Sequence, residues 1–284
     1  MMKIPALNEQ LLTLLFQRPH GQLRPEERKP PTAVAQRLVL QGKKEIVAHV
    51  YGQGRRILLV HGWGAEGVQL AGFVDPLVEK NFQVVLVDLP AHGQSSGQLT
   101  NAIDCADALI LVERRLGAFD AVIAHSWGCP VVVVAQQRGL QVGAASFIAP
   151  LPSLEAGIQE FSQRTDIDLA TLDRASRRLE KRMRVDRALM NLQLVGGQLG
   201  TPLLLIHDRD DHRTKIEESR LLEERWPNAR LIETQGLGHR RILRDPSVIK
   251  KAIAFVEQDQ DLRRTELESH FPPPESERLM TPAD

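Results

Sequence analysis

Short apolar runs alternate with helical segments along most of this chain, and this alternation constrains the fold more than any other feature. The apolar runs have the length and composition of strands that are buried on both faces of a sheet. They cover residues 57–60, 84–87, 121–124, 144–148, 203–206 and 229–232, with helical patterns at 68–80, 102–116 and 130–137. Strand and helix in alternation predict an α/β fold in which helices cover both faces of a mainly parallel sheet.

Two stretches depart from the alternation. Residues 37–40 and 45–50 predict a β-hairpin joined through Gly42 at the sheet edge. Between Pro150 and Pro202 no strand pattern occurs, and apolar residues recur at helical spacing, which predicts an inserted helical region. These apolar residues are Leu172, Ala175, Leu179 and Met183.

The predicted organisation therefore has four parts. They are an N-terminal helix and linker (1–32), a core (33–150 and 201–258), a helical insertion (151–200) and a poorly ordered C-terminal tail (259–284). The N-terminal part contains one apolar patch at residues 11–16, which is too short to cross a bilayer and precedes no cleavage site. We expect a surface helix there and no stable membrane insertion. A homodimer formed through this helix or through the insertion stays open.

Charge and cysteine usage exclude several classes of protein. The 284 residues carry 36 basic and 36 acidic side chains, so the formal net charge is zero. This balance gives no reason to expect a nucleic acid as partner. Cys105 and Cys129, the two cysteines, match no disulfide framework and no metal-ligand spacing. We therefore expect a cytoplasmic protein without a metal site.

The pentapeptide Ala124-His125-Ser126-Trp127-Gly128 lies between a predicted strand and a helical segment. A sharp strand-to-helix turn with small residues at its ends lifts a serine oxygen above the sheet, where it can act as a nucleophile. The helix that begins there adds its positive end near the reacting oxygen. A serine that only caps the helix is the simpler alternative.

Candidates for an acid and a base follow Ser126 in chain order. The strand at 203–206 runs into a segment that contains Asp210 and Asp211, and a later strand is followed by His239. An imidazole can act as general base near neutral pH, and a carboxylate just past a strand end can orient it. Each residue alone has a commoner explanation as an ordinary loop or helix-end residue. Their order along the chain and their places at element ends together favour a catalytic triad.

The segment His61-Gly62-Trp63-Gly64 follows the strand at 57–60. In a hydrolase, one backbone N–H of such a loop joins the N–H after the nucleophile to bind the developing oxyanion. The candidates for these two donors are Trp63 and Trp127.

The same loop allows a second interpretation. Gly62, Gly64 and Gly67 match the dinucleotide-binding pattern G-x-G-x-x-G, and Asp88 ends the next strand, where a ribose-binding acid belongs. This pattern starts after a hairpin rather than at the first strand of the fold. It also leaves the candidate triad unexplained, so an NAD(P)-binding oxidoreductase is a remote alternative.

These motifs together resemble those of the α/β-hydrolase superfamily over residues 34–256. Residues 88–97 are similar to its D-x-P-x-H-G-x-S loop. The pentapeptide at 124–128 resembles its nucleophile elbow and differs from the G-x-S-x-G pattern of that elbow only at Ala124. Family members usually carry G-x-x-D after the strand at 203–206. Asp208 stands at the position of that glycine, and Asp211 lies three residues after it, where the pattern has its acid. The resemblance therefore implies Asp211 as the acid, with Asp210 as the alternative. The resemblance also implies that the insertion forms a helical cap over the site.

The resemblance implies a two-step acyl transfer by a serine hydrolase. Ser126 attacks a carbonyl, His239 takes the serine proton, and water then releases the acyl group. We expect an ester of a small molecule as substrate and no cofactor, with thioester, amide and lactone substrates left open. A hydrolase-like protein that binds a ligand without turnover is the main alternative.

The insertion contains a strongly basic segment. A solvated helix face explains it best, and attraction of an anionic substrate is the sharper alternative. Its basic residues are Arg174, Arg177, Arg178, Lys181, Arg182, Arg184 and Arg187.

Overall fold

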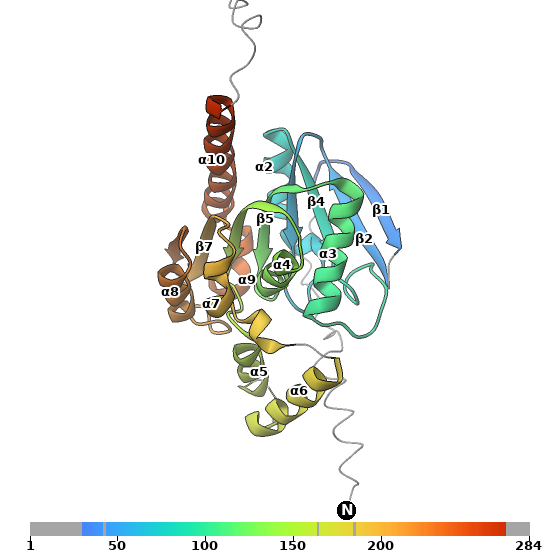
Figure 1. Ribbon diagram of the computed structural model, residues 1–284, viewed down its shortest axis with the longest axis vertical. Coiled ribbons are helices and arrows are strands. Elements are labelled where there is room, and N and C mark those ends of the chain that lie inside the picture. The colour runs from blue at the N-terminus through green and yellow to red at the C-terminus, as the bar shows by residue number, and fades with distance from the viewer. Residues whose placement is uncertain (1–29, 42–43, 164, 184–185, 271–284) are drawn as a thin grey trace, which may run out of the picture.

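The computed structural model describes residues 30–41, 44–163, 165–183 and 186–270. Within these ranges, eight strands form one sheet in the order β1-β2-β4-β3-β5-β6-β7-β8 (Figure 1). The strands are β1 (Ala35–Gln41), β2 (Glu45–Tyr51), β3 (Arg55–Val60), β4 (Phe82–Asp88), β5 (Phe119–His125), β6 (Val142–Ile148), β7 (Leu203–Asp208) and β8 (Ala229–Thr234). β1 and β2 form the predicted antiparallel edge hairpin, β2 also runs antiparallel to β4, and the remaining neighbours are parallel. The predicted fold class is confirmed.

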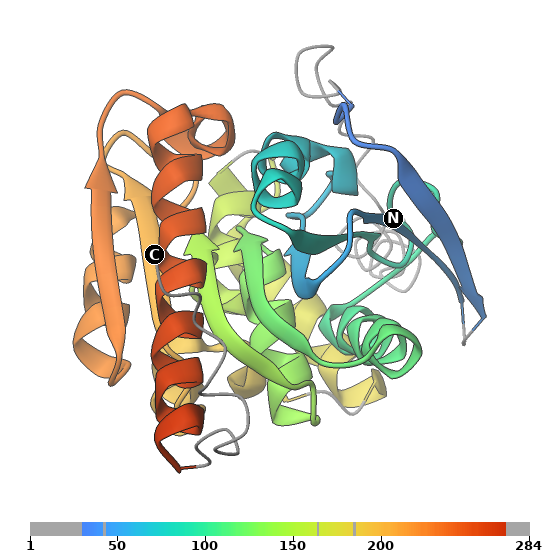
Figure 2. The ribbon, with the colours of Figure 1, turned by 90° about the horizontal axis from the view of Figure 1, so that it is seen from above.

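Helices cover both faces of this sheet, and Figure 2 shows the two layers. On one face, the 3-10 helix η2 (Gly67–Phe73), α2 (Val74–Glu79) and α10 (Pro246–His270) pack against the strands. On the other face lie α3 (Ala102–Leu116), α4 (Gly128–Gln137) and α8 (Ile216–Arg225). The central strands read as apolar runs because both of their faces are buried; Leu58 and Leu59, which alternate between the two faces, are both fully buried.

The predicted helix at 68–80 is two elements in the structure, since a 3-10 helix runs to Phe73 before α2 begins. The chain between Pro150 and Pro202 is helical in its described part, as expected. It forms α5 (Leu154–Gln163), α6 (Leu169–Met183), η3 (Arg187–Met190), α7 (Leu192–Val195) and η4 (Gly196–Gln198). In Figure 1, α5 and α6 lie beyond one end of the sheet.

The apolar spacing in this insertion corresponds to buried positions on α6. Leu172 and Ala175 are buried, while the side chains of Leu179 and Met183 lie outside the described residues. The apolar patch at residues 11–16 also lies outside them, so the surface helix stays a prediction.

The C-terminal part overlaps the predicted tail. α10 continues to His270, within the segment for which we predicted poor order, and residues 271–284 lie outside the described part of the chain, so the poor order of the tail stays a prediction. Residues 259–270 include two Glu, two Arg and two Leu, which favour helix formation, and the prolines that suggested disorder begin only at Pro272. No helix in the described part of the chain is both long enough and apolar enough to span a bilayer.

Candidate active site

Ser126 lies in the turn between β5 and α4 with a φ of 51°, a left-handed conformation that is uncommon for a residue with a side chain. Its backbone N–H donates to the carbonyl oxygen of Ile148 at 3.1 Å, which ties the turn to the neighbouring strand. Gly128 follows at the start of α4. A Cβ atom there would lie 2.6 Å from the Val60 carbonyl oxygen, so this approach of helix to strand requires glycine.

Ala124 is the position at which the elbow departs from the usual glycine. It is fully buried in β5, where it pairs with Val60 of β3 and Phe147 of β6. The register of β5 is regular through Ala124, so the sheet accommodates the alanine methyl group, and the sharp turn falls on the residues that follow.

The structure brings Ser126, His239 and Asp211 into one chain of hydrogen bonds. The distance from His239 Nε2 to Ser126 Oγ is 3.0 Å, and that from His239 Nδ1 to Asp211 Oδ2 is 2.7 Å. Asp211 follows β7, and His239 lies in α9 (Gly238–Arg241), just after β8. Both side chains are more than nine-tenths buried, so bulk water competes little for these contacts.

The Asp211 carboxylate has several further donors. The backbone N–H groups of Arg213 and Thr214 donate to Oδ1, and the Thr214 hydroxyl donates to Oδ2. Burial disfavours ionisation of Asp211, but hydrogen bonds from His207 and His239 outweigh it and hold the pKa of the carboxyl well below its ordinary value. Asp211 is therefore ionised at neutral pH, as a carboxylate that stabilises an imidazolium must be.

Asp210, the alternative acid, lies in an exposed position. Its Oδ2 accepts the backbone N–H of Gly236 at 2.9 Å, and Gly236 lies in the loop before His239. The geometry thus distinguishes the two neighbouring aspartates, since Asp211 contacts the imidazole and Asp210 contacts the loop before it.

Asp208 has a structural role that was not predicted from the sequence. It is fully buried at the end of β7, and it accepts the backbone N–H groups of Leu237 and Gly238, which directly precede His239. The Thr234 hydroxyl and the Asp210 N–H also donate to it. Burial raises the pKa of Asp208, but these four donors outweigh it, so the net shift is downward. The sequence does contain a signal for this role, since Asp208 stands where family members usually carry glycine. A buried carboxylate requires hydrogen-bond donors, so it indicates a set of donors around it.

Removing the Asp208 carboxylate is expected to lower both stability and turnover. In Asp208→Ala, four donors lose their acceptor, which should cost about 2–4 kcal/mol in the free energy of unfolding. The loop before His239 also loses its anchor, and a displaced base should lower kcat about 10- to 100-fold. Chemical denaturation and ester kinetics measure the two effects.

The matched control is Asp245→Ala, which removes another carboxylate that binds backbone N–H groups, at the start of α10. It should lose about 1 kcal/mol, as for a helix cap, with kcat unchanged. Equal kcat in wild type and Asp208→Ala would contradict the positioning role.

The Trp63 and Trp127 loops face each other beside Ser126, and their rings lie edge to face at 5.2 Å. Among the described residues, neither backbone N–H has a protein acceptor. The loop that contains Trp63 is held in place by a hydrogen bond, since the Gly64 N–H donates to His92 Nε2 at 3.1 Å. The two predicted donors thus lie in loops beside the candidate nucleophile, and their role in binding an oxyanion stays a prediction.

The dinucleotide interpretation finds no support in the geometry of Asp88. This carboxylate is buried, and it accepts the backbone N–H groups of Gly67 and Gln94 at 2.7 and 2.8 Å. It therefore joins two loops of the protein, whereas a ribose-binding acid must face a ligand.

His125 is a second residue beside the candidate triad whose role was not predicted from the sequence. Its Nε2 lies 2.9 Å from the carbonyl oxygen of His239, so Nε2 carries the proton and donates. Burial, followed by the nearby His239, holds the pKa of His125 well below its ordinary value and keeps the ring neutral. His125 thus supports the backbone of His239 without adding a charge beside it.

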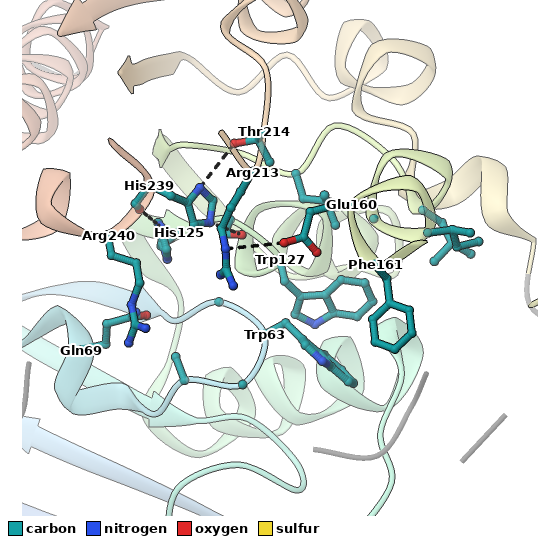
Figure 3. A pocket seen from close by; sticks show the side chains of 18 of the residues that line it. Trp63, Gln69, His125, Trp127, Glu160, Phe161, Arg213, Thr214, His239 and Arg240 are labelled. Carbon is teal, nitrogen blue, oxygen red and sulfur yellow. Dashed lines mark hydrogen bonds and ion pairs between the residues drawn. The ribbon is translucent and has the colours of Figure 1, made fainter. Parts of the chain in front are cut away.

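Ser126 and His239 line a cavity of about 210 Å³, and Figure 3 shows this cavity from close by. One side is apolar, with Trp63, Trp127 and Phe161, and α5 also contributes Leu154 and Ile158. The polar lining residues include Gln69, Glu160, Ser176, Arg213, Thr214 and Arg240. The helical insertion therefore forms part of the wall over the candidate nucleophile.

The basic residues of the insertion lie elsewhere. Among those with described side chains, none lines the cavity. Arg187 instead binds Glu155, Asp173 and Glu180 and links α5 to α6. Arg177 and Arg178 are exposed.

Within the described residues, no group of three or more His, Cys, Asp and Glu side chains is arranged to hold a metal ion. His207, next to the acidic segment, points into the fold and contacts the Ser219 hydroxyl at 2.6 Å.

Comparison with known proteins gives a family and two local relatives. The model of the alpha/beta hydrolase family matches residues 57–252, more than half of the chain. Two pimeloyl-[acyl-carrier protein] methyl ester esterases are locally similar. The one from Vibrio atlanticus (strain LGP32) is 50% identical over 48 residues, and the one from Methylococcus capsulatus (strain ATCC 33009 / NCIMB 11132 / Bath) is 46% identical over 44 residues. The matched segments cover 17% and 16% of this chain and 18% and 17% of those relatives.

Solved structures agree with the sheet topology over most of the chain. An esterase from Exiguobacterium antarcticum superposes with a TM-score of 0.63 at 15% identity, covering 77% of this chain and 98% of its own. The esterase PF2001 of Pyrococcus furiosus gives a TM-score of 0.63 at 16% identity, with coverages of 86% and 97%. At such identities the likeness establishes the fold, and together with the family match it shows that the chain belongs to the α/β-hydrolase family.

Proposed function

We propose that this α/β hydrolase is a serine hydrolase that cleaves an ester bond of a small molecule through Ser126, His239 and Asp211. The observation that carries the proposal is the chain of hydrogen bonds from Asp211 Oδ2 through His239 to Ser126 Oγ, at the base of a partly apolar cavity. A serine, an imidazole and an ionised carboxylate in this geometry suit nucleophilic acyl transfer.

In the proposed reaction, His239 Nε2 takes the proton of the Ser126 hydroxyl as the oxygen attacks the ester carbonyl. The N–H groups of Trp63 and Trp127 stabilise the negative charge that develops on the carbonyl oxygen. The imidazolium, stabilised by Asp211, then donates its proton to the leaving alcohol. A water molecule activated by His239 attacks the acyl-enzyme in the second step and releases the acid.

The local similarity to methyl ester esterases supports an ester of a small alcohol as the first substrate to test. The apolar wall of Trp63, Trp127 and Phe161 fits an aliphatic acyl group. The two cysteines are free and buried, a state that suits a reducing compartment and supports the proposed cytoplasmic location.

Labelling with a fluorophosphonate probe tests the proposal, because such probes phosphonylate an activated serine. We expect labelling of wild type and of Ser247→Ala, which removes a serine at the start of α10, and none of Ser126→Ala. A panel of p-nitrophenyl esters of increasing acyl length, with one thioester, one amide and one lactone, then ranks the bond types. Folded wild type that is neither labelled nor active on any substrate would instead favour a ligand-binding protein.

A further inference from the structure

Two arginines line the cavity from positions next to the candidate triad. Arg213 follows Asp211 by two residues, and Arg240 directly follows His239. Figure 3 shows Arg213 at the centre of the cavity and Arg240 on the side away from Trp127 and Phe161. Neither arginine belongs to the basic segment of the insertion, so they are a separate cationic feature.

Arg213 is held at its backbone, and its side chain reaches into the cavity. Its N–H donates to Asp211 Oδ1 at 2.8 Å, which fixes the residue beside the acid. The side chain is 38% exposed, and its Nε lies 3.5 Å from Oε1 of Glu160 on α5. A guanidinium presents its N–H donors in a planar fork that matches the two oxygens of a carboxylate.

Gln69 of η2 lies on the same side of the cavity as Arg240 (Figure 3). Its side chain is more than nine-tenths buried, and its Oε1 atom has no hydrogen-bond partner among the described residues. A buried amide that is left unpaired in a cavity wall is costly unless a ligand or water completes it. Because Oε1 is an acceptor, this part of the wall suits water or a hydrogen-bond donor of the ligand, and the anion itself must bind at the arginines.

The charges on the lining residues favour an anion. Besides histidines, the ionised side chains among the described lining residues are Arg213, Arg240 and Glu160, which sum to one positive charge. Since the cavity is partly enclosed, a carboxylate inside it interacts with these arginines in a lower dielectric than water provides.

We infer that the cavity selects esters that carry a carboxylate, with this anion bound by Arg213 and Arg240 and the apolar part of the molecule against Trp63, Trp127 and Phe161. Hydrolysis of such a substrate rests on the proposed function, whereas binding of the anion does not. Arg213 and Arg240 are thus specificity-determining residues of this site.

Two pairs of esters, matched in size and differing in charge, test the inference. Mono-p-nitrophenyl glutarate and p-nitrophenyl methyl glutarate place the charge in the acyl group, and 4-acetoxybenzoate and 4-acetoxybenzamide place it in the leaving group. The measured quantity is the ratio of kcat/KM for the anionic ester to that for its neutral partner. We expect this ratio to fall about tenfold in Arg213→Gln and in Arg240→Gln for at least one pair.

Two further variants separate local contact from general charge. Arg178→Gln removes the same charge from an exposed position on α6 and should leave the ratio unchanged. Glu160→Gln removes the carboxylate that competes for Arg213 and should raise the ratio, an effect opposite in sign. Equal ratios in wild type and all four variants would overturn the inference, as would an equal fall in Arg178→Gln.

Binding to Ser126→Ala makes the test independent of turnover. Isothermal titration calorimetry with monomethyl glutarate and dimethyl glutarate should show tighter binding of the anion, by about tenfold, and loss of this difference when Arg213→Gln is added. Preference for the anion without hydrolysis by wild type would sink the proposed function and keep this inference. Hydrolysis of neutral esters without any preference for the anion would support the proposed function and overturn this inference.

Discussion

Replacing Ser126 with alanine is expected to lower kcat for ester hydrolysis about a millionfold, to the level of residual catalysis by the rest of the site. The hydroxyl oxygen is the atom that His239 Nε2 contacts at 3.0 Å, and alanine offers no substitute nucleophile. The alanine variant keeps the Cβ atom, so the strained turn with its φ of 51° is unchanged. Its melting temperature should therefore stay close to that of wild type.

Steady-state kinetics on the best ester of the panel, with the melting temperature from circular dichroism, measure both quantities. Ser247→Ala serves as the control for loss of a serine away from the cavity. A Ser126→Ala protein that is folded and keeps more than about one per cent of wild-type kcat would rule out Ser126 as the nucleophile.

The second large effect is expected at Asp211. Asp211→Asn keeps the size of the side chain but replaces a charged acceptor with an amide, which favours the wrong imidazole tautomer and no longer stabilises the imidazolium. We expect kcat to fall about 10⁴-fold. Asp210→Asn should change kcat less than about threefold, because its amide oxygen can still accept the Gly236 N–H.

The two asparagine variants form a matched pair, since they make the same chemical change one residue apart. Kinetics at pH 8 and chemical denaturation of both proteins distinguish a catalytic loss from a folding loss. A larger loss of kcat in Asp210→Asn than in Asp211→Asn would reverse the assignment of the acid.

Most of the sheet could be predicted because buried parallel strands appear in a sequence as short apolar runs. The core of each predicted strand lies within an observed one, such as residues 57–60 within β3. The errors fall at strand ends, where β4, β5 and β7 continue into Asp88, His125 and Asp208. Polar side chains at the carboxyl ends of the strands interrupt the apolar pattern although the ladder continues.

The contacts around the candidate site could not be predicted in the same way. Spacing places Asp208, Asp210 and Asp211 on one loop, but only the direction of each side chain shows which of them contacts His239. The same holds for Arg213 and Arg240, which looked like ordinary charged residues in the sequence and lie in the cavity wall. Conversely, those arginines of the insertion whose side chains the structure describes bind carboxylates of the insertion itself or are exposed.

The contact between His239 and Ser126 joins residues that are 113 positions apart, and the residue before Ser126 is joined to His239 over 114 positions. During synthesis, β5 and the turn with Ser126 leave the ribosome well before the strand and loop that carry His239. Closure of this long loop comes late, and the entire insertion emerges in between. On the proposed function, activity is therefore acquired at the end of folding, and a nascent chain that stops before residue 239 has the proposed nucleophile without the proposed base.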